Sequence, residues 1–125
     1  MDILNLFAGI GGNRKFWKGE VTAVEKNKII AKQYKKNYPD DRVVIGDALK
    51  FLEDNYMNYD FIWSSPPCQT HAKFRLTKPP IIPDRTSLYG QFIFLKHYAP
   101  SDTTWVVENV KGWYKHLIQP TLFLV

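Results

Sequence analysis

The chain has 125 residues, 45% of them hydrophobic, and carries a formal net charge of +5. This length predicts a single domain over residues 1–125, and the hydrophobic content excludes a disordered chain. The basic excess suits a polyanionic partner, and a single cysteine excludes an internal disulfide. No apolar run reaches the roughly 20 residues that span a bilayer, so we expect no membrane contact and a cytoplasmic protein, or a nuclear one in a eukaryote.

The first expected strand, Ile3 to Ala8, is apolar enough to be buried on both faces. It runs into Gly9-Ile10-Gly11-Gly12, where glycines let the backbone turn sharply and approach a ligand closely. A short helix is expected to begin over Arg14 to Lys18. Arg14 stands where the dinucleotide fingerprint G-x-G-x-x-G needs its third glycine, so that fingerprint is incomplete. Both a ligand-binding turn and a turn that only packs a helix on a strand fit these glycines.

The second expected strand is Val21 to Val24, and Glu25 follows it directly. A carboxylate at this position can accept two hydrogen bonds from the hydroxyls of a ribose. Asn27 is placed to cap the next helix, which we expect over Lys28 to Tyr38. The lysines of that helix are typical of a solvated face.

The third expected strand is Arg42 to Ile45, followed by Gly46 and Asp47. Asp47 can accept a hydrogen bond from an adenine amino group, and it can also cap the predicted helix Ala48 to Asn55. Both roles are open to the same carboxylate. The fourth strand is expected over Tyr59 to Ser64.

The cysteine loop follows this fourth strand. Pro66 and Pro67 stop the strand, because each proline fixes φ and neither can donate a ladder hydrogen bond. Cys68 comes next, at the carboxyl end of a parallel strand, where ligands of open α/β sheets bind. A thiol on such a loop is well placed to be a nucleophile, although free cysteines are also often small buried apolar residues.

A long irregular stretch, Gln69 to Arg85, separates this loop from the next element. Loops of this length in a compact domain are usually functional. The basic side chains of this stretch suit contact with phosphates, and a solvated loop is the alternative. These side chains are Lys73, Arg75, Lys78 and Arg85. Ser87 can cap a helix that runs to about Tyr98, with Leu88, Phe92 and Leu95 on one face. The fifth strand is expected over Thr103 to Val107, ending at Glu108.

Five strands that alternate with helices predict an α/β fold with a doubly wound, mostly parallel, Rossmann-like sheet. Crossover connections in such a sheet are right-handed. His71, His97 and His116 share no ligand spacing, so we predict no metal site.

Five short segments resemble, in order, the motifs of the cytosine-C5 DNA methyltransferases: Leu6 to Gly12, Val24-Glu25, Gly46-Asp47-Ala48, Pro67-Cys68-Gln69 and Glu108-Asn109-Val110. Each segment lies at an expected junction between a strand and a loop. The resemblance covers essentially the whole chain but only the first part of the family's catalytic domain. We find no match to the family's later arginine-bearing motif, target-recognition region or closing segment. A second copy of the chain or a complementing subunit is therefore expected against the apolar tail Leu122 to Val125 and the strand edge near Trp105 to Val107.

The resemblance implies methyl transfer from S-adenosylmethionine to carbon 5 of cytosine in DNA, with S-adenosylhomocysteine as product. Cys68 would add to carbon 6 as the nucleophile, and Glu108 would donate a proton to N3. In the family's strand order, the first and fourth strands are central neighbours. The residues expected at the cofactor are Phe7, Gly9, Ile10, Gly11, Gly12, Glu25, Lys26, Asp47, Ala48, Pro67 and Leu88. Those expected at the DNA are Gln69, Lys73, Arg75, Lys78, Arg85 and Asn109.

Two alternatives stay open beside this reading, and a third fits the sequence less well. The substrate could be cytosine in RNA, since related RNA enzymes resemble the same core. The chain could also be a cofactor-binding or partner-binding half-enzyme that needs a second chain for activity. A nicotinamide-dependent oxidoreductase fits Glu25 but fails at Arg14. A DNA methyltransferase of this kind is expected in a bacterium, an archaeon or a phage, where it serves restriction and modification.

Overall fold

The computed structural model describes residues 1–66 and 88–108, the side chains of 88 and 89 excepted. One five-stranded sheet has the order β3-β2-β1-β4-β5, and every neighbouring pair is parallel. The strands are β1 (Asp2–Leu6), β2 (Glu20–Glu25), β3 (Arg42–Ile45), β4 (Phe61–Ser64) and β5 (Thr104–Val107). The helices are α1 (Lys28–Asn37), α2 (Ala48–Asn55), the 3-10 turn η1 (Tyr56–Asn58) and α3 (Leu88–Tyr98).

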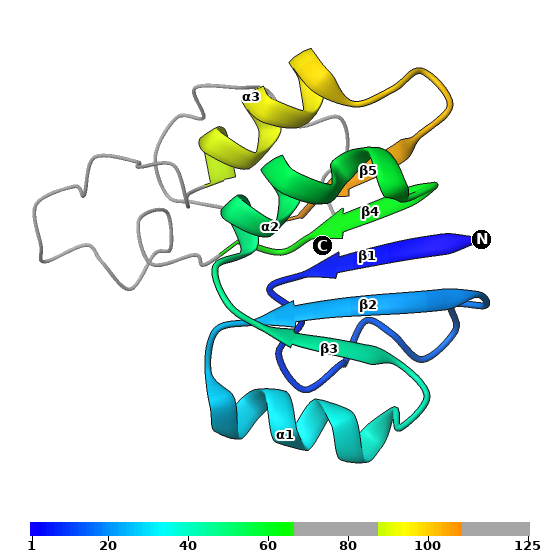
Figure 1. Cartoon of the computed structure of the whole chain (residues 1–125), viewed down its shortest axis with the longest axis vertical. Helices are drawn as coiled ribbons and strands as arrows, with labels where there is room; N and C mark the ends of the chain where they lie inside the picture. The colour runs from blue at the N-terminus through cyan, green and yellow to red at the C-terminus, as the bar shows by residue number, and fades with distance from the viewer. Residues whose placement is uncertain (67–87, 109–125) are drawn as a thin grey trace, which may run out of the picture.

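The helices cover both faces of this sheet, which confirms the predicted α/β doubly wound fold. Figure 1 shows α2 and α3 side by side over β4 and β5, with α1 beside β3. The core on the α2 and α3 face combines strand residues with helix residues, among them Leu4, Leu6, Ile62, Leu52 and Leu95. The core on the other face joins Ala8 and Ala23 to Tyr34 of α1. The first and fourth strands are central neighbours, as predicted.

The first strand ends two residues earlier than predicted. Phe7 has φ 56°, a left-handed conformation that cannot continue a strand. The predicted helix over Arg14 to Lys18 is wrong: the chain makes successive i→i+3 turns between Ala8 and Trp17 instead. The physical reason lies in the side chain of Arg14, which donates to the Trp17 carbonyl and so closes the turn where a helix would continue.

Two of the three predicted helix caps are confirmed, and the third, Ser87, lies outside the described residues. The side chain of Asn27 accepts hydrogen bonds from the amides of Ile29 and Ile30, and Asp47 accepts from the amide of Lys50. The other boundaries differ from prediction by at most two residues, as at β4, which begins at Phe61.

The apolar face predicted for the third helix is only partly right. Leu95 is fully buried and Phe92 is half-buried. Among the α3 side chains that the structure describes, the other fully buried one is Gln91, one turn before Leu95. A polar residue therefore occupies the buried stripe of α3.

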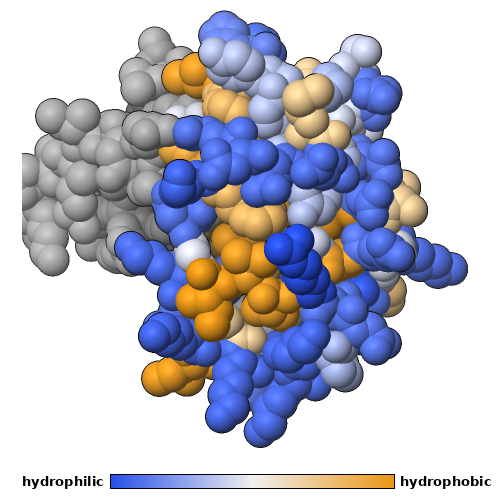
Figure 2. Space-filling model, in the orientation of Figure 1, coloured by the Kyte–Doolittle hydropathy of each residue, from blue (hydrophilic) through white to orange (hydrophobic). Residues whose placement is uncertain are grey.

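Hydrophobic side chains also reach the surface near the carboxyl halves of β2 and β3. Figure 2 shows apolar side chains gathered between α2 and α1, with hydrophilic side chains around them. Ile45, the last residue of β3, is 52% exposed. Within residues 1–66 and 88–108, no helix has the length and apolar character needed to cross a bilayer.

Candidate functional site

The candidate site lies at the carboxyl edge of the sheet, to which all five strands point (Figure 1). Backbone hydrogen bonds join the strand ends there. The amide of Ser65 donates to the Leu6 carbonyl at 3.3 Å, and the amide of Glu108 donates to the Ser64 carbonyl at 2.8 Å. The ends of β1, β4 and β5 are thus held side by side. The glycine loop, the start of the cysteine loop up to Pro66, and Glu108 therefore lie at one edge. Pro67 and Cys68, which we also expect at this edge, lie outside the described residues.

Glu25 joins the glycine loop to the start of α1. Its Oε1 accepts from the Gly9 amide at 3.1 Å, and its Oε2 accepts from the Asn27 amide at 2.7 Å. Each carboxylate oxygen can accept a further hydrogen bond, because an ionised carboxylate offers about four acceptor sites. Glu25 is only half-buried, so its remaining acceptor sites are not all enclosed by the protein.

The glycines of the loop serve different purposes. Gly9 has φ 59°, and a Cβ added there would meet no atom within 4 Å. A Cβ at Gly12 would also find open space. Gly11, in contrast, has φ 92° and is buried; a Cβ there would lie 2.5 Å from a ring carbon of Tyr38. Gly9 and Gly12 leave room for a ligand, while Gly11 lets the loop pack against α1.

The other residues predicted for a cofactor lie around this loop. Phe7 is half-buried and packs against the core on the α2 and α3 face. Ile10 is 55% exposed, and its carbonyl accepts from the Asn37 side chain. Lys26 and Asp47 are exposed, and Ala48 is buried at the start of α2.

The start of the cysteine loop is anchored by β4. The indole nitrogen of Trp63 donates to the Ser65 hydroxyl at 2.7 Å, and Pro66 is buried. Glu108 is half-buried directly after β5. Together with the backbone hydrogen bonds to the ends of β1 and β5, these contacts fix the backbone that leads to the predicted nucleophile.

Several predicted site residues lie outside the described residues: Pro67, Cys68, Gln69, Lys73, Arg75, Lys78, Arg85 and Asn109. Leu88 begins α3, which places its backbone. The predicted oligomer contact of the tail Leu122 to Val125 is likewise outside them.

Two polar features were missed by sequence reasoning. The first is Gln91, whose Oε1 lies 3.5 Å from the Ser64 hydroxyl at the end of β4. Its amide nitrogen is a buried donor without a hydrogen-bond acceptor in the described part of the chain. The only signal in the sequence is its spacing, one helical turn before Leu95.

The second missed feature is a polar network beneath the glycine loop. The buried side chain of Asn5, on the central strand, exchanges two hydrogen bonds with Asn13, at 3.1 and 3.2 Å. Close by, Asp41 accepts from Arg14 and from the hydroxyl of Tyr34. Polar residues in a strand that is otherwise apolar were the available signal.

Two pKa shifts reflect this network. Burial and the hydrogen bond to Asp41 raise the pKa of Tyr34 well above its ordinary value. The hydrogen bond to Asp41 also raises the pKa of Arg14. Tyr34 therefore stays protonated as a donor, and Arg14 stays charged.

Comparison with known proteins gives consistent matches. The model of the family "C-5 cytosine-specific DNA methylase" matches residues 1–122. The tRNA (cytosine(38)-C(5))-methyltransferase of Spodoptera frugiperda is 30% identical over 122 residues, covering 89% of this chain. The crystal structure of a DNMT2 mutant from the same organism superposes with a TM-score of 0.60 at 26% identity, over 90% of this chain.

Two further solved structures share the fold. The Dnmt2 methyltransferase of S. pombe has a TM-score of 0.63 at 20% identity over 90% of this chain. A putative DNA modification methyltransferase encoded within a prophage of E. coli has a TM-score of 0.55 at 21% identity over 92%. The chain spans about a third of the length of these relatives: 36% of both S. frugiperda proteins, 37% of the S. pombe protein and 33% of the prophage protein.

Proposed function

The chain belongs to the family of C-5 cytosine-specific DNA methylases, and we propose that it methylates carbon 5 of cytosine in DNA through a covalent adduct at Cys68. The observation that carries this proposal is the arrangement at the carboxyl edge. The glycine loop, with Gly9 hydrogen-bonded to Glu25, lies at the end of β1, and Glu108 is bonded to the end of β4 next to it. A cofactor site and a catalytic site can therefore share one edge.

The residues of this edge fit S-adenosylmethionine, the cofactor that family membership supports. Glu25 keeps acceptor sites for the ribose hydroxyls, and Gly9 leaves open space beside them. Asp47 uses Oδ2 to cap α2, and its other oxygen can accept from the adenine amino group. Exposed Ile45 offers an apolar contact to the ring at the same edge. Bound S-adenosylmethionine would supply a sulfonium methyl group and leave as S-adenosylhomocysteine.

Two side chains are proposed to act on the cytosine. The thiolate of Cys68 forms a bond to carbon 6, and the electron pair of the carbon 5–carbon 6 double bond makes carbon 5 nucleophilic. The carboxyl group of Glu108 donates a proton to N3 and so offsets the charge that develops on the ring. Carbon 5 would then take the methyl group, whose bond to the sulfonium sulfur of the cofactor breaks. Loss of the carbon 5 proton to solvent water acting as base, and return of the N3 proton to Glu108, would let the bond between the Cys68 sulfur and carbon 6 break, which restores the aromatic ring and the free thiolate.

The target base must leave the stack of a duplex before Cys68 can reach carbon 6. The proposed DNA contacts are Gln69, Lys73, Arg75, Lys78, Arg85 and Asn109. The four basic residues would bind phosphates, which is the sequence-independent part of nucleic-acid affinity.

Cytosine in RNA is the second candidate substrate. It is favoured by the 30% identity to a tRNA cytosine methyltransferase. The chemistry at carbon 6 is the same for both nucleic acids, so the residues of the carboxyl edge do not distinguish them.

The test incubates the chain with S-adenosylmethionine and either cytosine-containing duplex DNA or tRNA, and measures 5-methylcytosine by mass spectrometry. The proposal predicts methylated DNA, and none with Cys68→Ser. Methylation of tRNA alone would keep the reaction and change the substrate. Binding of S-adenosylhomocysteine without methylation of either nucleic acid would contradict the proposal and favour the half-enzyme alternative.

A further inference from the structure

We propose that Arg14 and Asp41 are positioning residues, whose ion pair holds the glycine loop in the conformation that presents Gly9 to Glu25. The inference rests on the proposed function, because it assigns these residues a role in cofactor binding without contact with the cofactor. It starts from the segment Phe7 to Trp17, which joins β1 to the turn before β2.

This segment lacks the hydrogen-bond ladder of a helix. Its backbone bonds are isolated turns, in which Gly11 donates to Ala8, Arg14 to Gly11 and Trp17 to Arg14. Phe7, Gly9 and Gly11 all have positive φ. A loop of this kind has many alternative conformations, and fixing one residue costs about 1–2 kcal/mol of conformational entropy. Side-chain contacts must therefore select the conformation seen here.

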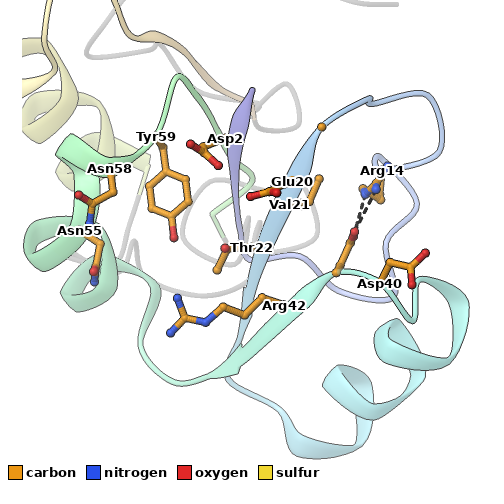
Figure 3. Close-up of a pocket in the computed structure, with 12 residues that line it drawn as sticks. Asp2, Arg14, Glu20, Val21, Thr22, Asp40, Arg42, Asn55, Asn58 and Tyr59 are labelled. Carbon is orange, nitrogen blue, oxygen red and sulfur yellow. Dashed lines mark hydrogen bonds and ion pairs between the residues drawn. The ribbon is translucent and has the colours of Figure 1, made fainter.

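Arg14 supplies the most extensive of these contacts. Its Nε donates to Asp41 Oδ2 at 2.7 Å, and its Nη2 donates to Asp41 Oδ1 at 3.0 Å, as the dashed lines of Figure 3 show. Its Nη1 donates to the Trp17 carbonyl at 2.7 Å, and its guanidinium lies 5.3 Å from the centre of the Tyr38 ring. One side chain thus joins the loop to itself, to Tyr38 at the C-cap of α1, and to the residue before β3.

Asp41 is in turn held from α1. The hydroxyl of Tyr34 donates to its Oδ2 at 2.7 Å, and Lys35 Nζ donates to its backbone carbonyl at 2.6 Å. The Asp41 side chain is 3% exposed, and that of Arg14 is 14% exposed. The carboxylate is therefore a buried, fixed acceptor, and only a forked donor placed where Arg14 lies can use both of its oxygens.

Asn13 and Gly11 give the same loop two further anchors. Asn13 pairs with the buried Asn5 of β1 through two hydrogen bonds. Gly11 passes so close to α1 that an added Cβ would lie 3.0 Å from Tyr34 and 2.5 Å from Tyr38. Gly9 instead faces open space, and among residues 1–66 and 88–108 its one hydrogen bond is to Glu25. The anchoring residues are thus separate from the ligand-facing residue, so they can hold the loop in place without contacting a ligand.

The expected signature follows from the energetics of buried ion pairs. Replacing both partners with residues of similar size is often neutral for stability, because the desolvation penalty disappears with the attraction. What such a replacement loses is the geometric selection of the loop. We therefore expect removal of the pair to weaken cofactor binding more than it lowers stability.

The test uses the double variant Arg14→Met/Asp41→Asn, in which Tyr34 can still donate to the new amide oxygen. Calorimetry, far below the unfolding temperature, measures its affinity for S-adenosylhomocysteine and for cytosine-containing DNA. We expect affinity for S-adenosylhomocysteine to fall by about tenfold or more, a change of about 1.4 kcal/mol, with DNA affinity unchanged. Partial unfolding would lower the affinity for both ligands equally. A loss confined to S-adenosylhomocysteine therefore shows that the pair positions the glycine loop.

The matched control is Lys50→Met/Asp54→Asn, which removes the same charges from an exposed pair on α2, 3.6 Å apart. It should leave both affinities unchanged. Arg14→Lys keeps the positive charge but loses the two parallel donors of the guanidinium group, so it should lower the affinity for S-adenosylhomocysteine by about threefold. This variant tests the inference if the double variant does not fold. A folded variant that binds S-adenosylhomocysteine as tightly as the unaltered chain overturns the inference. Absence of binding by the unaltered chain would instead contradict the proposed function, and this inference with it.

Discussion

Glu25 is the residue whose replacement should have the widest effect, because its two oxygens hold two parts of the carboxyl edge. Oε1 accepts from Gly9 at 3.1 Å, and Oε2 accepts from Asn27 at 2.7 Å. Glu25→Ala removes both acceptors and, with them, the proposed acceptors of the ribose hydroxyls. Glu25→Gln keeps one acceptor oxygen and turns an NH2 group toward the other amide. The two variants therefore form a graded series.

The expected magnitudes follow from the number of hydrogen bonds lost. The Asn27 amide is exposed and water can replace its partner, whereas the Gly9 amide is part-buried. Loss of the Gly9 bond should lower the free energy of unfolding by about 2 kcal/mol and the midpoint temperature of thermal unfolding by about 8 °C. Loss of the two ribose bonds should weaken S-adenosylhomocysteine by about 100-fold in Glu25→Ala and about tenfold in Glu25→Gln.

Scanning calorimetry measures the midpoint, and titration calorimetry measures the affinity of the folded protein. A lower midpoint with unchanged affinity would leave Glu25 a role in holding the loop and would refute its role at the ribose. An unchanged midpoint would show that the bond to Gly9 contributes nothing, and the interpretation of the whole glycine loop would be wrong.

Three further predictions concern the loop support and the nucleic acid. The pKa of Tyr34 is raised in the folded state, so its contribution to stability is complete below about pH 10, the unfolded value, and is lost as pH rises further, at up to about 1.4 kcal/mol per pH unit. Urea unfolding measured from mildly to strongly alkaline pH should show that the free energy of unfolding falls more steeply with pH in the unaltered chain than in Tyr34→Phe. Equal slopes in the two proteins would contradict a raised pKa of Tyr34. Gly11→Ala should destabilise the fold by about 2–3 kcal/mol because of its positive φ and the contact with Tyr38, whereas Gly12→Ala should be close to neutral in the same unfolding measurement. The logarithm of DNA affinity should fall linearly with the logarithm of the salt concentration. Removing the four basic charges of the loop together should make this slope less steep and leave cofactor affinity unchanged; an unchanged slope would show that the loop does not contact phosphates. The four residues are Lys73, Arg75, Lys78 and Arg85.

Sequence reasoning succeeded where the determinants are local or repeated. Asn27 and Asp47 were predicted as caps because cap chemistry depends on a few neighbouring residues. The parallel sheet followed from strands that alternate with helices, and its central pairing of β1 with β4 followed from the family resemblance. The edge that collects Gly9, Glu25 and Asp47 could therefore be predicted from the sequence.

It failed where contacts distant in the sequence decide the structure. Arg14 and Asp41 are 27 residues apart, and nothing near Arg14 signals that its side chain would end the expected helix. The distinct roles of Gly9 and Gly11 depend on Tyr38, which α1 brings under the loop. Gln91 is buried beside the expected apolar positions Phe92 and Leu95, and its contact with Ser64 joins residues that are 27 positions apart. The roles of Cys68 and its loop, and the expected second subunit, stay predictions.

The most direct test of the central claim is a covalent trap. In DNA that carries 5-fluorocytosine, carbon 5 has fluorine where a proton must leave, so the bond between Cys68 and carbon 6 cannot break after methyl transfer. We predict that the chain, with S-adenosylmethionine, forms an adduct that survives denaturing electrophoresis, has the mass of protein plus methylated DNA, and is absent in Cys68→Ser. Methylation of ordinary cytosine under the same conditions without any adduct, or an adduct that persists in Cys68→Ser, would contradict the proposed mechanism.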